Sequence, residues 1–443
     1  MTPALALLGG KPIRKLPFTR WPIFDRSDER RVARALRSGR WGRLDGGWEV
    51  KDFERRFAAM HGCKHGIAVV NGTVSLRIAL LAAGLNAGDE VIVPAYTFFS
   101  TASAVVEANL VPVFADIDLN TFNLAPASVR AVLTRNTRAI IPVHFAGQPA
   151  AMDELNAIAR KRKLFVLEDA AHAHGASYSN RPAGSLGHVS SFSFQSSKNL
   201  TAGEGGIICT NDGKMAEACR SIHNCGRVAG GIWYEHHRIS GNYRLGELQG
   251  ALLDRQLDRL EAQTRIRNRN GQYLAERLAS IPGLYPQKRP AECTRHSYHL
   301  FMLRLVAREF GAPREAVLQA LQAEGVPCST GYGFPLYRQP MFRQQTFGPY
   351  LPEISSRLDY RRVRCQNSEL ICREEGIWLG QNLLLGSRAD MDDIARAFGK
   401  VHENPRALTE WFRRRADIPV RSDLQRAPRA RSHRATVRRQ GAA

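Results

Sequence analysis

The feature that most constrains the fold is a series of short apolar segments that alternate with helix-like segments between residues 66 and 210. Each apolar segment ends at a polar residue or a turn. Such alternation predicts β–α–β units, because a helix returns the chain to the start of the next parallel strand. The expected strands are Gly66–Val70, Glu90–Val93, Val111–Ala115, Arg138–Val143, Leu164–Glu168 and Ile207–Thr210. The middle of the chain is therefore predicted to be an α/β domain with a mainly parallel sheet.

A long helical pattern follows this region. Leucines recur at helical spacing over residues 245–278, and Ile281-Pro282-Gly283 ends the pattern. Beyond it, the sequence predicts strands over Tyr298–Val306 and Leu379–Leu385 and helices over Pro313–Glu324 and Asp390–Phe398. We expect three parts: an N-terminal segment with the large domain and the linking helix at 1–280, a smaller α+β domain at 281–403, and a basic, disordered tail at 404–443.

The net charge of +22 suggests a polyanionic partner until its position is considered. Eleven Arg and three acidic residues lie beyond residue 403, so the tail carries +8 and the other 403 residues carry +14. No nucleic-acid-binding motif accompanies the tail. A polyanion-binding regulatory protein therefore stays open as an alternative, whereas specific nucleic-acid recognition is not expected.

The eight cysteines form no CxxC pair and no cluster with zinc-ligand spacing, so we expect no metal site. Scattered cysteines of this kind are typical of reduced thiols in a cytoplasmic protein. Neither a signal peptide nor a membrane-spanning segment is evident.

Three motifs at strand ends are candidates for chemistry. Asn71-Gly72-Thr73 lies between a strand and a helix, where it could hold a phosphate or simply cap the helix. Asp169, within Glu168-Asp-Ala-Ala-His172, follows a buried strand and could pair with a ligand cation or cap the next turn. Lys198 follows Ser193-Phe-Gln-Ser-Ser197 and could form a Schiff base or be a solvated lysine. Together, a phosphate cradle, a carboxylate and a lysine match the requirements of pyridoxal 5′-phosphate.

The sequence resembles the DegT/StrS family of pyridoxal-phosphate-dependent sugar aminotransferases over about residues 7–400. The motifs that carry the resemblance are Asn71-Gly-Thr73, Val93-Pro-Ala-Tyr-Thr-Phe98, Glu168-Asp-Ala-Ala-His172, Ser193-Phe-Gln-Ser-Ser-Lys198, Gly203-Glu-Gly-Gly206 and Asn242-Tyr-Arg244. The resemblance implies fold type I, like aspartate aminotransferase, and a homodimer with shared active sites.

The resemblance also implies roles for individual residues. Lys198 would form the Schiff base and move protons, and Asp169 would pair with the pyridine nitrogen. His172 would contact the phenolic oxygen, and Phe98 would stack on the ring, with Tyr96 as the alternative for this role. The expected phosphate ligands are Gly72, Thr73, Ser193 and, from the neighbouring subunit, Asn242. Gln195 would lie near the phosphate or the substrate.

The implied reaction is a ping-pong transfer of an amino group from glutamate or glutamine to a keto-sugar or keto-cyclitol. Within the family, the sequence looks most like the branch of scyllo-inosose aminotransferases and aminohydroxybenzoate synthases, which favours carbocycles. Candidate substrate contacts are Trp41, Tyr332, Tyr337 and Arg338. His188 departs from the acidic residue common in the family. A sugar dehydratase on the same fold is the alternative enzyme, although Lys198 argues against relatives that have His at this position.

Overall fold

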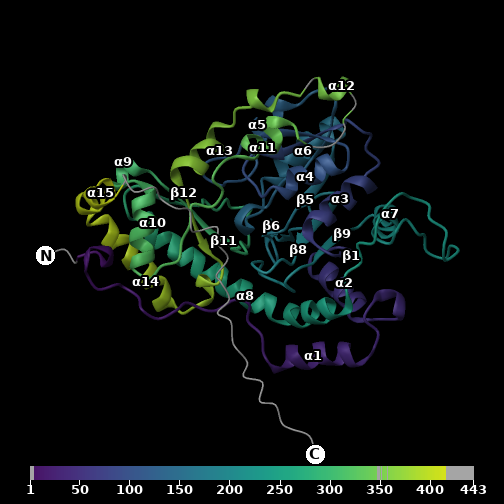
Figure 1. The fold of residues 1–443 in the computed structure, drawn as a ribbon, viewed down its shortest axis with the longest axis horizontal. Helices are drawn as coiled ribbons and strands as arrows, with labels where there is room; N and C mark the ends of the chain where they lie inside the picture. Colours follow the sequence, from purple (N-terminus) through teal and green to yellow (C-terminus); the bar gives the residue numbers. More distant parts are fainter. Residues whose placement is uncertain (1–3, 347–349, 351, 357, 416–443) are drawn as a thin grey trace, which may run out of the picture.

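A seven-stranded sheet forms the centre of the larger domain (Figure 1). The computed structural model describes residues 4–346, 350, 352–356 and 358–415. In spatial order the strands are β1 (His65–Val69), β9 (Gly206–Thr210), β8 (Val189–Ser193), β5 (Phe165–Asp169), β4 (Thr137–Ile140), β2 (Glu90–Pro94) and β3 (Val111–Ala115). The strands from β8 to β3 pair in parallel, and β9 is antiparallel to both of its neighbours. The prediction of a mainly parallel α/β sheet is confirmed.

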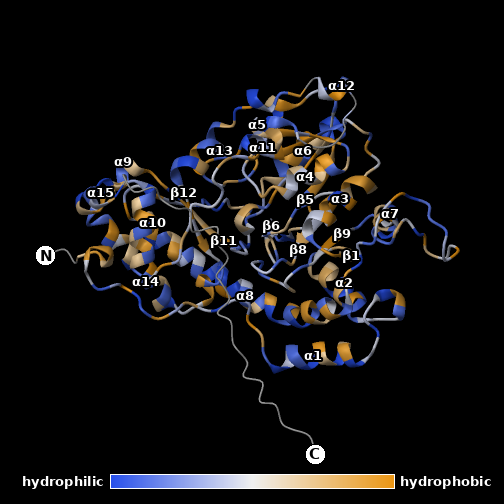
Figure 2. Cartoon of the chain, viewed as in Figure 1, coloured by the Kyte–Doolittle hydropathy of each residue, from blue (hydrophilic) through white to orange (hydrophobic). Residues whose placement is uncertain are grey.

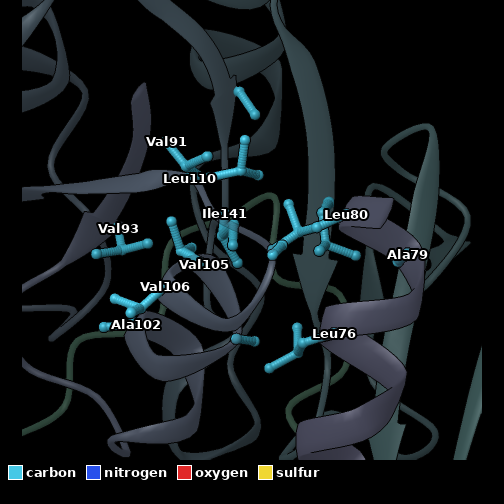
Figure 3. Close-up of a cluster of buried hydrophobic side chains, with 14 of the residues drawn as sticks. Leu76, Ala79, Leu80, Val91, Val93, Ala102, Val105, Val106, Leu110 and Ile141 are labelled. Carbon is cyan, nitrogen blue, oxygen red and sulfur yellow. The ribbon is translucent and has the colours of Figure 1, made fainter. Parts of the chain in front are cut away.

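Helices supply the apolar side chains that bury this sheet. They are α2 (Glu49–Met60), α3 (Gly72–Ala82), α4 (Ser100–Glu107), α5 (Pro126–Val132), α6 (Met152–Arg162) and α7 (Gly213–His223). Figure 3 shows Leu76 and Leu80 of α3, Val91 and Val93 of β2 and Val105 of α4 in one buried cluster. Strands that are covered by helices need apolar residues at nearly every position, which explains why they are short continuous apolar runs in the sequence.

Helix α8 (Glu247–Ala279) spans 33 residues and connects the two domains (Figure 1). It packs against α1 (Arg26–Arg37) and α2 near its start and against α14 (Arg388–His402) of the smaller domain. Figure 2 shows hydrophobic and hydrophilic residues interspersed along α8, as expected for a helix buried on one side. None of the helices in the described part of the chain, α8 included, is long and apolar enough to cross a membrane.

The smaller domain is built on a three-stranded antiparallel sheet. Its strands are β10 (Leu284–Pro286), β11 (Leu300–Leu305) and β12 (Gly376–Gly380), and α10 (Arg314–Ala323) and α14 supply apolar residues to the same core. The strand predicted over Leu379–Leu385 is wrong in its second half, because β12 ends at Gly380 and Leu383–Leu385 form a 3₁₀ helix. A short apolar run does not distinguish a strand from a buried helical turn, and Leu383 and Leu384 are buried as such a turn.

The start of the basic tail is structured, which corrects the expected disorder at 404–443. Helix α15 (Pro405–Arg413) begins with proline in its first turn and buries Leu408 completely, with Trp411 and Phe412 packed on the same core. These three residues follow helical spacing, so they form one apolar face among arginines. Residues 416–443 lie outside the described residues.

Candidate active site

A cavity of about 560 Å³ opens where the strands of the large sheet end. It is lined by residues that follow β1, β2, β4, β5 and β8, and by residues of the smaller domain. This is the edge at which parallel α/β sheets bind ligands. The predicted site residues that line it are Gly72, Thr73, Phe98, Asp169, His172, Ser193, Gln195, Lys198 and Tyr332.

The N-terminus of α3 approaches β8 so closely that only glycine fits at position 72. A Cβ atom there would lie 2.7 Å from the Cβ of Ser193. Asn71, rather than Thr73, caps the helix, because its side chain accepts a hydrogen bond from the Val74 N–H at 2.9 Å. The Thr73 hydroxyl instead lies 2.6 Å from the Ser100 hydroxyl. Hydroxyl groups at a helix N-terminus form a cradle that suits a phosphate.

Asp169 ends β5 as a buried carboxylate whose hydrogen-bond donors are neutral. The Thr101 hydroxyl donates to one oxygen at 2.8 Å, and the Ala171 N–H donates to the other at 3.2 Å. Burial raises the pKa of Asp169, while these two donors and the nearby Lys198 lower it. A buried carboxylate is stabilised by a positively charged hydrogen-bond donor, and a protonated ring nitrogen would be such a donor to Asp169.

Lys198 lies in the loop between β8 and β9, where its backbone N–H donates to the Gln195 carbonyl at 2.8 Å. Burial lowers the pKa of its amine to about 8, against the opposing effect of Asp169. A substantial fraction of the amine is therefore neutral near physiological pH, as a nucleophilic amine requires. Lys198 lines the cavity, so it is not the solvated surface lysine that the sequence left open as an alternative.

His172 offers a donor to the cavity. Its Nδ1 accepts a hydrogen bond from the Ala146 N–H at 3.3 Å, so its own proton is on Nε2. Burial, followed by the charge of Lys198, holds the pKa of His172 well below its ordinary value, which leaves the ring neutral.

Aromatic side chains form two parts of the cavity wall. Phe98 lies in the wall and is 56% exposed, whereas Tyr96 is buried behind it and its hydroxyl accepts from Trp378 Nε1 at 2.9 Å. On the other side, the rings of Tyr332 and Trp378 meet edge to face with centroids 4.8 Å apart. Gly331 has a φ of +72°, and a Cβ there would lie 2.1 Å from the Trp378 ring, so glycine allows this packing.

Four predicted contacts do not line the cavity of their own chain. Tyr337 is buried and donates from its hydroxyl to Glu369, and Arg338 forms an ion pair with the same carboxylate at 2.6 Å. Trp41 is 56% exposed and donates from Nε1 to the Leu36 carbonyl. Asn242 is exposed on the segment between α7 and α8. The aromatic and basic residue types of Tyr337 and Arg338 suit a substrate, but these side chains bind Glu369 instead.

Sequence reasoning missed several residues that the fold brings to the cavity. Thr101 of α4, His299 at the start of β11 and Trp378 of β12 are the clearest cases. None belongs to a motif interpreted as chemical, and His299 and Trp378 lie beyond the last of those motifs, Asn242-Tyr-Arg244. The available signal was a histidine near the start of the strand predicted over Tyr298–Val306.

The cavity as a whole fits pyridoxal phosphate. A phosphate cradle at α3, a buried carboxylate with neutral donors and a lysine with a lowered pKa lie around one space of suitable size. Among the described residues, no group of three or more Cys, His, Asp or Glu side chains could hold a metal ion.

Comparisons with known proteins agree with this geometry. The model of the DegT/DnrJ/EryC1/StrS aminotransferase family matches residues 22–363. The L-glutamine:2-deoxy-scyllo-inosose aminotransferase of Streptomyces paromomycinus is 36% identical, over 92% of this chain and 100% of the relative. The 3-amino-5-hydroxybenzoate synthase of Amycolatopsis mediterranei (strain S699) is also 36% identical, over 87% of this chain and 99% of the relative.

A solved structure gives the same result for the fold. The crystal structure of 3-amino-5-hydroxybenzoic acid synthase superposes with a TM-score of 0.80 at 35% identity, over 88% of this chain and 100% of the other. The chain therefore belongs to the DegT/DnrJ/EryC1/StrS aminotransferase family, and it is an aminotransferase of fold type I whose cofactor is pyridoxal 5′-phosphate.

Proposed function

We propose that this enzyme transfers an amino group from glutamine, or from glutamate, to a keto-cyclitol or a related cyclic ketone. The observation that carries the proposal is the convergence of Lys198, Asp169 and the α3 cradle on one cavity whose far wall is aromatic. The names of the relatives support glutamine as the donor and a carbocycle as the acceptor.

The residues that would hold the cofactor follow from their chemistry. Gly72, Thr73 and Ser193 would bind the phosphate, Asp169 the protonated ring nitrogen, and His172 would donate from Nε2 to the phenolic oxygen. Phe98 would cover one face of the ring. When bound, pyridoxal phosphate supplies an electron sink that stabilises negative charge on the carbon bearing the amino group.

Lys198 would perform the proton transfers. Its lowered pKa favours the neutral amine, so Nζ would hold the cofactor through its aldehyde group and would be the base that removes the proton from the donor α-carbon. In the second half of the reaction Nζ would return a proton to the carbon that becomes aminated. Because one cavity serves both substrates, the donor product must leave before the acceptor binds.

The wall opposite the sheet supports an uncharged ring as the acceptor. Tyr332 and Trp378 present aromatic surface, and Leu300 adds an apolar side chain. Sugar and cyclitol rings have apolar C–H faces that pack on such surfaces. In the described residues lining the cavity, Lys198 is the only Lys or Arg side chain, so the cavity itself offers no second cation for a phosphorylated acceptor.

We also propose a homodimer in which Asn242 reaches the phosphate of the partner's site. The segment between α7 and α8 extends away from the rest of the fold (Figure 1), and Asn242 lies near its base, where it forms a bridge with Asn224. The segment carries the exposed apolar residues Ile232, Trp233, Tyr234 and Ile239. An exposed group of large apolar side chains is typical of a protein–protein interface. The eight free thiols support a reducing compartment such as the cytoplasm.

The alternatives are less well supported. A sugar dehydratase with His in place of the lysine is disfavoured by Lys198 itself and by the names of the relatives. A polyanion-binding regulatory protein does not explain the cavity.

The test offers purified enzyme a panel of keto-cyclitols and nucleotide-linked keto-sugars with glutamine or glutamate, and identifies the aminated product by mass. We expect amination of a keto-cyclitol. Lys198→Ala should abolish the visible absorption of the covalent cofactor adduct and lower transamination by at least about 10³-fold. Lys161→Ala, an exposed lysine of α6, is the control and should change neither. Amination of nucleotide-linked sugars alone would contradict the proposed acceptor class.

A further inference from the structure

A second imidazole, that of His299, lies against His172 in the cavity. The ring centroids are 4.2 Å apart with 35° between the planes. His172 follows strand β5 of the large domain, whereas His299 directly precedes β11 of the smaller domain. His299 is buried and lines the cavity, but none of the motifs discussed above gives it a role.

The hydrogen bonds of the two histidines give their Nε2 atoms opposite roles, one as a donor and the other as an acceptor. The Asn199 side-chain NH₂ donates to the Ser297 carbonyl at 2.8 Å, which leaves the amide oxygen facing His299. That oxygen lies 3.4 Å from His299 Nδ1 and can only accept, so Nδ1 carries the proton of the neutral ring. The other nitrogen, Nε2, is then an acceptor, whereas Nε2 of His172 is a donor.

The surroundings of His299 keep this acceptor neutral. Burial, and then the nearby His172, Lys198, His174 and Arg267, hold the pKa of His299 well below its ordinary value. The His299 Nε2 atom has no hydrogen-bond partner among the described residues. It is also absent from the unpartnered polar atoms that the protein encloses completely, so part of its surface is accessible. It is therefore open to the cavity that the residue lines.

In the rest of the smaller domain's wall, Leu300 has no polar side-chain atom and Trp378 Nε1 already donates to Tyr96. The Tyr332 hydroxyl can donate as well as accept, so His299 Nε2 is the group of this wall that can only accept. A neutral lone pair attracts hydroxyl groups, which can donate, and repels carboxylates, which only accept. His299 thus suits a polyhydroxylated ring and not the carboxylate of an amino-acid donor.

We propose that His299 Nε2 accepts a hydrogen bond from a hydroxyl group of the amino acceptor and thereby selects hydroxylated rings over their deoxy analogues. This inference rests on the proposed function, because it requires a cyclic polyol ketone as the acceptor. His299 is a specificity-determining residue for the second half of the reaction only.

The experiment measures the two half-reactions separately in holoenzyme by rapid-mixing absorption spectroscopy. The donor half uses glutamine, and the acceptor half uses a hydroxylated cyclic ketone and its analogue lacking one hydroxyl group. For His299→Leu we expect the donor half to stay within about 3-fold of wild type. The acceptor-half kcat/KM should fall by about 10-fold or more for the hydroxylated ring, with little change for at least one deoxy analogue. His299→Gln, which keeps an acceptor oxygen, should recover part of the preference.

A matched control is His296→Gln. His296 is a buried histidine of the same segment, but both of its nitrogens are used, one by the Tyr298 N–H and the other by Gln287, and it does not line the cavity. Equal losses in both halves for His299→Leu, or an unchanged preference for every deoxy analogue, would overturn the role of His299. A wild-type enzyme that reacts with glutamine but aminates no hydroxylated cyclic ketone would instead overturn the proposed function.

Discussion

Asp169 illustrates how the site works at the scale of single residues. It is 5% exposed and accepts hydrogen bonds from two neutral donors, so a bound cation would complete its environment. The neighbouring Glu168 is buried as well, but His144 and three backbone N–H groups, those of Gly184, Leu186 and Gly187, satisfy it. Of these two adjacent carboxylates, Asp169 is therefore the one available to a ligand.

We expect Asp169→Asn to lower kcat/KM for transamination by about 10²-fold or more, because a neutral amide no longer favours a protonated ring nitrogen. Thr101→Val, which removes one donor and leaves the carboxylate, should cost less than about 10-fold. Steady-state kinetics with matched thermal melting checks both variants. A loss for Thr101→Val as large as that for Asp169→Asn would show that positioning, and not charge, matters most.

The pKa of Lys198 gives a pH dependence with a defined sign. Burial shifts it from 10.5 to about 8, so the amine loses its proton as the pH rises through about 8. The rate at which apoenzyme and pyridoxal phosphate form the covalent adduct should therefore rise with pH and level off above that value. Stopped-flow absorbance over a pH series measures this rate. A midpoint near 10.5 would mean that the site does not shift the lysine.

At the scale of elements, the sequence predicts the strands that are apolar and misses those that are not. Strand β8 contains three serines in Val189–Ser193, yet it is buried throughout, because Ser190 and Ser191 find hydrogen-bond partners in the core. Helix α15 was missed because its single short apolar face, Leu408, Trp411 and Phe412, lies in an arginine-rich stretch that has no sustained periodicity. Strand β8 and helix α15 both depend on hydrogen-bond partners or packing surfaces that lie far away in the sequence. A local sequence pattern carries no information about such distant partners.

Helix α15 divides the basic tail into two parts with different expected effects on stability. Truncation after Arg415 should leave the melting temperature and transamination unchanged. Truncation after Glu403 removes Leu408 from the core and should lower the melting temperature by roughly 4 °C or more. Differential scanning calorimetry measures this, with Leu408→Ala in the chain ending at Arg415 as an intermediate control. Equal melting temperatures for the two truncated chains would show that α15 contributes nothing to the domain.

The motif residues of the site could be predicted because they lie at strand ends of one sheet. Lys198, Asp169 and Gly72 are far apart in sequence, but parallel strands bring their carboxyl ends to one edge. The contribution of the smaller domain could not be predicted in this way. His299 reaches the cavity because of how the two domains pack, and residue spacing carries no information about that packing.

At the scale of the whole molecule, the proposed dimer with shared active sites predicts complementation between a variant that lacks Lys198 and one that lacks Asn242. Dimers reassembled from Lys198→Ala and Asn242→Ala chains should regain about a quarter of wild-type activity, because half of the dimers are mixed and each mixed dimer has one intact site. The readout is transamination after mixing, with both parent proteins assayed alone.

Lys198→Ala mixed with Asp169→Asn is the control for this experiment. Both residues line the cavity of the same chain, so every site in the mixed dimer keeps one defect and no activity should return. Recovery in the control, or none in the test mixture, would contradict the proposal that Asn242 acts across the interface.

The division of the cavity between two domains has a consequence for how new activities could arise on this scaffold. Gly72, Asp169 and Lys198, which would hold the cofactor, belong to the large domain, whereas Tyr332 and Trp378 belong to the smaller one. We infer that the smaller domain can be exchanged between relatives as the part of the chain that selects the acceptor. A chimaera that received it from a relative should inherit that relative's choice of acceptor and keep its own amino-group chemistry.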